Sequence, residues 1–112
     1  MFFTNAYIFV WKGANLVKEN KFQSQLIQEL KEVFPGCIIL KNDPNYIQGF
    51  PDLTIFYKEH WAVLECKKDK ESPKQANQEY YVDKLNEMSY SRFIYPENKE
   101  EILNELQQSF QS

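Results

Sequence analysis

Residues 49–67 decide the fold, and they read GFPDLTIFYKEHWAVLECK. Two runs rich in β-branched and aromatic residues, 52–57 and 61–67, flank a short polar turn, which predicts an antiparallel β-hairpin. Because side chains alternate between the two faces of a strand, Glu65 and Lys67 should project from the same face. The second run is otherwise apolar, as in a buried central strand, where ionised groups are costly unless they are paired or bind a metal ion.

The sequence around this hairpin predicts an αβββαβ order plus a C-terminal helix. This order indicates a single α/β domain over residues 1–112, with a mixed four-stranded sheet flanked by helices. Residues 1–14 are ambiguous, because Tyr7–Trp11 has strand composition; they could form an added edge strand or an arm used in dimerisation. The other expected elements are a helix over 15–34, a strand over 37–40, a helix from Ser72 to about Glu87, a strand over 92–95 and a helix after Asn98.

Composition excludes several classes of protein. The 112 residues are 43% hydrophobic and 16% aromatic, which supports one packed core and excludes general disorder. Cys37 and Cys66 are too few for a disulfide framework or a four-cysteine zinc site, and they are expected to be reduced. His60 is the single histidine, which argues against chemistry that needs two. The net charge of −3 by itself argues against a nucleic-acid partner.

The acidic residues suggest a site for a hard metal ion. Asp52 precedes the first strand of the hairpin and Glu65 lies near the end of the second, with Lys67 on the same side. Glu19 lies about 20° from Leu26 around the axis of the first helix, on its core-facing stripe. Carboxylates without a histidine or thiolate set suit Mg²⁺ or Mn²⁺, and a neighbouring lysine can position a water molecule.

This pattern resembles a known family. Gly49-Phe50-Pro51-Asp52, followed after twelve residues by Glu65-Cys66-Lys67, looks like the motif of the PD-(D/E)xK nuclease superfamily. The upstream helix with its inward Glu19 and the Ser72-Pro73-Lys74-Gln75 helix start match the same layout. The resemblance covers roughly residues 16–96 and is closest to small VRR-NUC-type nucleases and to phage and archaeal Holliday-junction resolvases. It implies a restriction-endonuclease-like core over residues 15–96, followed by a C-terminal helix over 97–112.

The resemblance also implies a role for each motif residue. Asp52, Glu65 and the backbone carbonyl of Cys66 would bind Mg²⁺, with Mn²⁺ as a substitute, and Glu19 would complete or tune the metal site. Lys67 would orient the attacking water. The remaining implied contacts are to the scissile phosphate or Lys67 from Gln75 and to the DNA backbone from Lys68, Lys70 and Lys74.

The implied reaction is hydrolysis of DNA phosphodiester bonds that leaves a 5′-phosphate, directed at Holliday junctions or other branched DNA. A homodimer with two sites fits paired cuts. Two alternatives stay open: a general nicking or flap nuclease of a phage replication or packaging set, and a non-cleaving nuclease-fold module that binds DNA or a protein. The sequence shows no signal peptide and no membrane span, so a cytoplasmic protein is expected, in the host cytoplasm if viral.

At some positions an ordinary structural role competes with the functional one. Gln75 could merely complete a capping box with Ser72, and Tyr80 and Tyr81 are expected to pack their helix rather than stack on bases.

The negative net charge has a local origin, since residues 97–112 carry four glutamates against one lysine and residues 1–96 have equal numbers of acidic and basic side chains. Because a bound cation would offset the carboxylates of the metal site, the net charge no longer argues against DNA.

Overall fold

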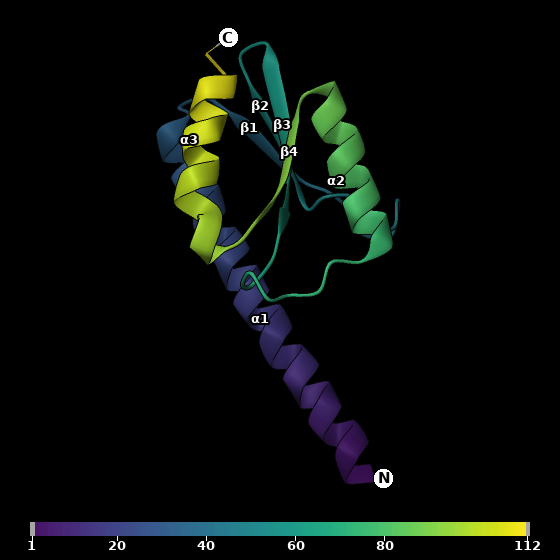
Figure 1. Cartoon of the computed structure of the whole chain (residues 1–112). Coiled ribbons are helices and arrows are strands. Elements are labelled where there is room, and N and C mark those ends of the chain that lie inside the picture. The colour runs from purple at the N-terminus through teal and green to yellow at the C-terminus, as the bar shows by residue number, and fades with distance from the viewer. Residues whose placement is uncertain (1, 112) are drawn as a thin grey trace.

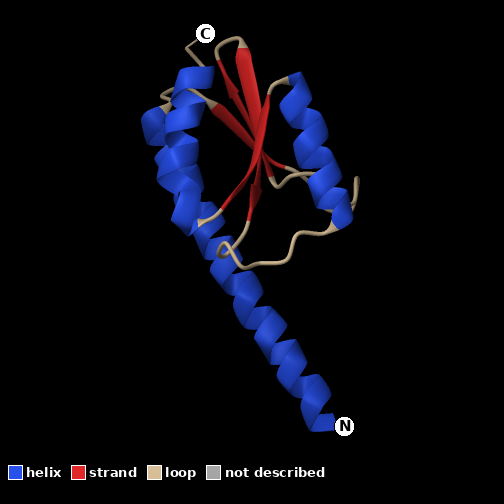
Figure 2. Cartoon of the chain, viewed as in Figure 1, coloured by secondary structure: helices blue, strands red, loops and turns tan. Residues whose placement is uncertain are grey.

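The protein is built from a four-stranded mixed sheet with helices on both faces. The structure is a computed structural model, which describes the backbone of residues 2–111 and the side chains of residues 15–111. Figures 1 and 2 show the arrangement. The elements in chain order are α1 (Phe2–Val33), β1 (Ile38–Lys41), β2 (Leu53–Tyr57), β3 (His60–Cys66), α2 (Ala76–Met88), β4 (Tyr90–Ile94), the 3₁₀ helix η1 (Pro96–Asn98) and α3 (Lys99–Ser109).

The predicted hairpin forms the centre of the sheet. The strand order is β1-β2-β3-β4; β1 and β3 both pair with β2 antiparallel, and β4 runs parallel to β3. The register places Leu53 opposite Leu64, so Asp52 and Glu65 lie side by side at one end of the hairpin. At the other end, the turn places Lys58 in the left-handed region, at φ 56°. The α/β class, the element order and the mixed sheet are therefore confirmed.

The two faces of the sheet are covered by different helices. α1 and α3 cover one face and α2 covers the other (Figure 1). The side chains of β3 alternate between the two faces of the sheet. Ala62, Leu64 and Cys66 point toward α1 and α3 and belong to the main hydrophobic core. Glu65 and Lys67 therefore point to the opposite face, as the alternation predicts. α1 contributes to the core through the apolar residues Phe22, Leu26 and Leu30, which are spaced four apart, and Phe34 directly after the helix continues the series.

One of the two alternatives for the N-terminal residues is excluded, while the dimerisation arm stays a prediction, and the predicted start of the second helix is wrong. The backbone of residues 2–14 continues α1 as helix, so an added edge strand over residues 1–14 is excluded for 2–14, and residue 1 lies outside the described residues. Ser72 does not cap α2: its hydroxyl donates to Asp69 Oδ1 at 3.2 Å, and the helix begins at Ala76. Helix propagation from a formed turn is favourable enough to override the weak strand preference of the first residues. No helix within residues 2–111 combines the length and apolar character needed to cross a membrane.

A close approach between the β1–β2 loop and α2 fixes the helix relative to β2. Gly49 has φ +86°, and a Cβ atom there would lie 2.4 Å from Asn77 Cβ and 2.9 Å from its carbonyl carbon. Only a residue without a side chain permits this contact. Phe50 continues the contact, with its ring 5.6 Å from the Tyr81 ring. The loop that carries Asp52 is thereby held against the first turns of α2.

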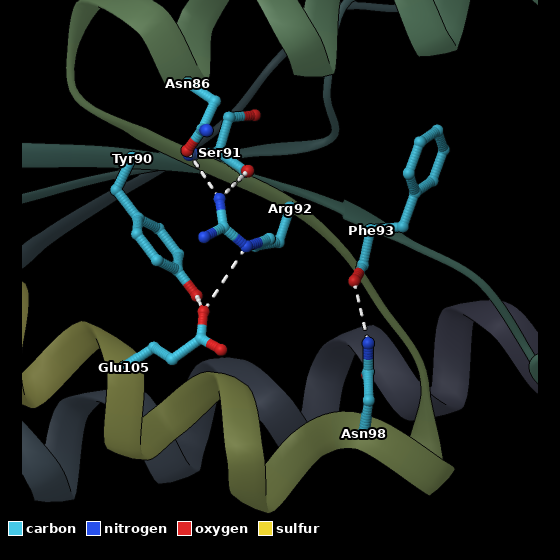
Figure 3. Close-up of polar contacts among 7 residues, drawn as sticks. All are labelled: Asn86, Tyr90, Ser91, Arg92, Phe93, Asn98 and Glu105. Carbon is cyan, nitrogen blue, oxygen red and sulfur yellow. Dashed lines mark hydrogen bonds and ion pairs between the residues drawn. The ribbon is translucent and has the colours of Figure 1, made fainter.

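Side chains cover the outer edge of β4. The backbone N–H of Ser91 donates to Asn86 Oδ1 at 3.1 Å, and the Phe93 carbonyl accepts from Asn98 Nδ2 at 3.0 Å. Arg92 Nη1 donates to the Ser91 carbonyl at 2.8 Å, while its Nε lies 3.3 Å from Glu105 Oε1 on α3 (Figure 3). Backbone groups that an edge strand normally leaves open are therefore occupied.

Candidate active site

The end of the β2–β3 hairpin carries a cluster of ionisable side chains. Asp52 is positioned by the backbone, because its Oδ2 accepts a hydrogen bond from the Cys66 N–H at 2.9 Å. Glu65 and Lys67 project beside it from alternate positions at the end of β3, and they are only 4% and 7% exposed. The Lys67 N–H donates to the Ile94 carbonyl at 2.9 Å, which extends the β3–β4 pairing past the charged residues. Three ionisable side chains are thus held at one place by main-chain geometry.

Gln78 connects the buried lysine to the buried glutamate. Lys67 Nζ donates to Gln78 Oε1 at 2.8 Å, and Gln78 Nε2 donates to Glu65 Oε2 at 3.2 Å. The same Oε1 accepts from the Gln75 N–H at 3.1 Å, at the start of α2. The helix terminus therefore fixes the amide orientation, and the amide holds Lys67 and Glu65 in one arrangement.

Sequence reasoning missed Gln78. The expected start of the helix at Ser72 placed Gln75 at the third helical position, whereas Gln75 caps the helix and Gln78 occupies that position. A signal was available, since Gln75 and Gln78 have the spacing of a capping pair. Gln75 is exposed but lines the same hollow as Lys67, so its predicted contact with a phosphate stays a prediction.

Burial raises the pKa of all three carboxyl groups, and the charge of Asp52 raises those of Glu65 and Glu19 further. Burial, followed by the charge of Asp52, raises the pKa of Glu65 to about 8. Burial also raises the pKa of Asp52, and the Cys66 N–H opposes this rise. Burial, followed by the charge of Asp52, also raises the pKa of Glu19 on α1. The site therefore favours either a retained proton or a bound cation.

The donors fit a hard divalent ion. Asp52, Glu65 and the Cys66 carbonyl offer oxygen ligands only, and Mg²⁺ is commonly held by one or two carboxylates with several waters. Among the side chains of residues 15–111, no group of three or more histidine, cysteine, aspartate or glutamate residues is arranged to hold a metal ion. Glu19 is thus not part of such a group, and two carboxylates with the carbonyl remain the candidate set. Burial raises the pKa of the Cys66 thiol well above its usual range, which argues against a thiolate role.

Two neighbouring hollows give access to this cluster. One, of about 370 Å³, is lined by residues of α1, the end of β3 and the segment before α2, including Glu19, Lys67 and Lys68. The other, of about 330 Å³, is lined by Glu19, Asp52 and residues of the β1–β2 loop. Leu16 and Glu19 of α1 line both hollows, so the two hollows adjoin at these side chains.

The three predicted DNA-binding lysines do not converge. Lys68 lines the hollow beside Lys67 and pairs with Asp69 at 2.9 Å. Lys70 is exposed, and its backbone N–H donates to Glu97 Oε2 at 3.3 Å. Lys74 turns toward β4, with its Nζ 4.6 Å from the centre of the Phe93 ring. Of the three, Lys68 therefore has the most direct position for a phosphate contact.

The raised pKa of Glu65 predicts a pH-dependent stability. Without metal, folded Glu65 keeps its proton up to about pH 8, whereas the unfolded carboxyl loses it near pH 4.5. The free energy of unfolding should therefore fall as the pH rises from about 4.5 to about 8. Urea denaturation in EDTA across this range measures it, and Glu65→Gln should flatten the dependence. Asp83→Asn, at an exposed carboxylate of α2, should leave it unchanged. If the free energy of unfolding changes equally with pH in wild type and Glu65→Gln, the raised pKa of Glu65 is not the cause of the pH dependence.

Comparisons with known proteins returned no match, whether with protein-family models, curated proteins or solved structures.

Proposed function

We propose that this chain is a metal-dependent DNA endonuclease that uses Mg²⁺, with Mn²⁺ as a substitute. The observation that carries the proposal is the meeting of Asp52, Glu65 and Lys67 at the end of one hairpin, with Gln78 bonded to both Glu65 and Lys67. The restriction-endonuclease-like assignment of the fold belongs to the same proposal. The αβββαβα order and the position of the charged cluster at the sheet end support it.

Each side chain has a task in this reaction. Asp52, Glu65 and the Cys66 carbonyl would hold the metal ion, which would supply positive charge to stabilise the phosphate and to favour ionisation of water. Lys67 Nζ orients the water whose oxygen attacks the phosphorus, and Gln78 keeps that ammonium group in place. The bond from phosphorus to the 3′ oxygen breaks, leaving a 5′-phosphate and a 3′-hydroxyl. Lys68 contacts a neighbouring phosphate from the rim of the hollow.

Metal binding separates this proposal from a non-cleaving module of the same fold. Asp52→Asn keeps the size of the side chain but removes the carboxylate. We expect Mn²⁺ affinity to fall by more than the about 10- to 100-fold that loss of an outer-shell partner costs, with a parallel loss of cleavage. Calorimetric titration of the metal measures the first effect, and cleavage of labelled duplex, flap and four-way-junction DNA in Mg²⁺ measures the second. Asp83→Asn is the matched control on the exposed surface of α2. Retention of full metal affinity and cleavage by Asp52→Asn would refute the proposal.

A further inference from the structure

Asn42 directly follows β1 and contacts the chain at and on both sides of Asp52. Its backbone N–H donates to the Asp52 carbonyl at 2.8 Å, which extends the antiparallel pairing of β1 and β2 by one residue. Its side-chain Nδ2 donates to the Pro51 carbonyl and to Thr54 Oγ1, both at 2.9 Å. Because a side-chain amide nitrogen carries two hydrogens, both donors of Asn42 are used next to Asp52.

These bonds hold the place where the long β1–β2 loop re-enters the sheet. Asp52 is the last residue of this loop, which begins at Asn42 and includes exposed residues. Pro51 is fully buried, so its carbonyl needs a partner within the protein. The Asn42 amide supplies that partner and, through Thr54, is also tied to the first turn of side chains in β2. The main chain on each side of Asp52 is thereby fixed to one side chain.

The position of this main chain determines where the Asp52 carboxylate lies. Asp52 Oδ2 accepts the Cys66 N–H at 2.9 Å, so the carboxylate crosses from the start of β2 to the end of β3. A shift of the backbone at Asp52 would draw the carboxylate away from Cys66 and from the metal position proposed between them. Asn42 also lines the hollow of about 330 Å³ that Asp52 lines, which places the amide at the site itself.

We propose that Asn42 is a positioning residue for the metal site and acts through Asp52. This inference rests on the proposed function and adds to it a residue outside the 49–67 stretch. Asn42 is not assigned as a metal ligand. Its side chain holds the backbone around Asp52, so that the carboxylate keeps its bond to Cys66 and stays ready to bind the ion. Loss of a group that orients a metal ligand typically lowers metal affinity about 10- to 100-fold.

The first measurement uses the metal-free protein. In EDTA, the Cys66 amide proton in a ¹H–¹⁵N correlation spectrum reports its bond to Asp52, because a hydrogen bond to a carboxylate moves an amide proton downfield. Asp52→Ala removes the acceptor and gives the reference position of the free amide. We expect Asn42→Ala to move the Cys66 proton upfield, toward this reference, and to speed its exchange with solvent. Thr54→Val removes one of the two side-chain bonds and should cause a smaller shift in the same direction.

The second measurement is metal affinity. In calorimetric titration, Asn42→Ala should bind Mn²⁺ about 10- to 100-fold more weakly than wild type at a temperature where both are fully folded. Asn45→Ala removes an exposed side chain from the same loop. Gly36→Ala strains the backbone at φ +88°, before the opposite end of β1. Both controls should keep the wild-type Cys66 amide position and Mn²⁺ affinity, which separates positioning of Asp52 from a general loss of stability.

The outcomes distinguish this inference from the proposed function. The inference is wrong if the Cys66 amide proton stays at its wild-type position in Asn42→Ala and Thr54→Val, or if Asn42→Ala keeps wild-type Mn²⁺ affinity. An equal loss of affinity in Gly36→Ala would also overturn it, because any destabilisation would then have the same effect. If the wild-type protein binds no Mn²⁺, the proposed function fails, while the amide measurement in EDTA still decides whether Asn42 holds Asp52 in place.

Discussion

Lys67→Met is expected to lower the rate of DNA cleavage about 10²- to 10³-fold, the usual effect of removing one charge-stabilising or proton-handling group. Lys67 Nζ is held at 2.8 Å by Gln78, and the residue is 7% exposed. Methionine retains much of the length of the lysine stem and fills the same buried space without the charge. The variant should therefore fold while losing the ammonium group that we propose orients the attacking water.

The readouts distinguish a lost water-orienting group from a lost metal. Mn²⁺ titration should still show binding by Lys67→Met, whereas cleavage at saturating metal stays low. Lys84→Met serves as the matched control, because Lys84 is exposed on α2 and forms a long ion pair, of 3.8 Å, with Glu87. Gln78→Leu removes the hydrogen bonds to Lys67 and Glu65 and should cause a smaller loss of rate. Cleavage by Lys67→Met at the wild-type rate would exclude Lys67 from the reaction.

The second large effect concerns folding. Gly49→Ala is expected to destabilise the protein by about 3 kcal/mol or more, since it combines a left-handed backbone with a steric clash. The new methyl carbon would lie 2.4 Å from Asn77 Cβ and 2.9 Å from backbone of α2, so the helix has to shift. Such a shift would also displace Gln78, and any cleavage activity should fall with stability.

Gly36→Ala isolates the backbone contribution. Gly36 has φ +88°, nearly the same as Gly49, but nothing lies within 4 Å of an added Cβ atom. Gly36→Ala should therefore lower the free energy of unfolding by about 1 kcal/mol, from the backbone conformation alone. Urea denaturation of both variants measures the difference. Equal destabilisation would mean that the loop and α2 move apart without cost.

The hairpin and its charged face could be predicted from the sequence because both depend on local pattern. Alternation along one strand is enough to place Glu65 and Lys67 together, and a short turn is enough to bring Asp52 beside them. The first turn of α2 could not be placed this way. Ser72-Pro73 has the composition of a helix start, yet the Ser72 hydroxyl donates its hydrogen bond to Asp69, and the helix begins at Ala76.

Contacts between distant segments explain the other omissions. The role of Gln78 depends on how α2 lies across β3, and the 59% exposure of Tyr80 depends on which side of α2 faces the sheet. Val82, the buried residue of α2, sets that side. No local pattern near residue 80 reports either relation. The N-terminal residues show the reverse case, in which strand-like composition was overridden by continuation of a helix.

The covered edge of β4 limits how copies of this protein can associate. In the described residues, Asn86, Asn98 and Arg92 occupy backbone groups on that edge, while β1 at the opposite side of the sheet exposes Ile38 and Leu40. Two copies that joined their β1 strands would present only covered edges to further molecules. Sheet-to-sheet growth would then end at a pair, and an open-ended fibre of native molecules has no second edge to use.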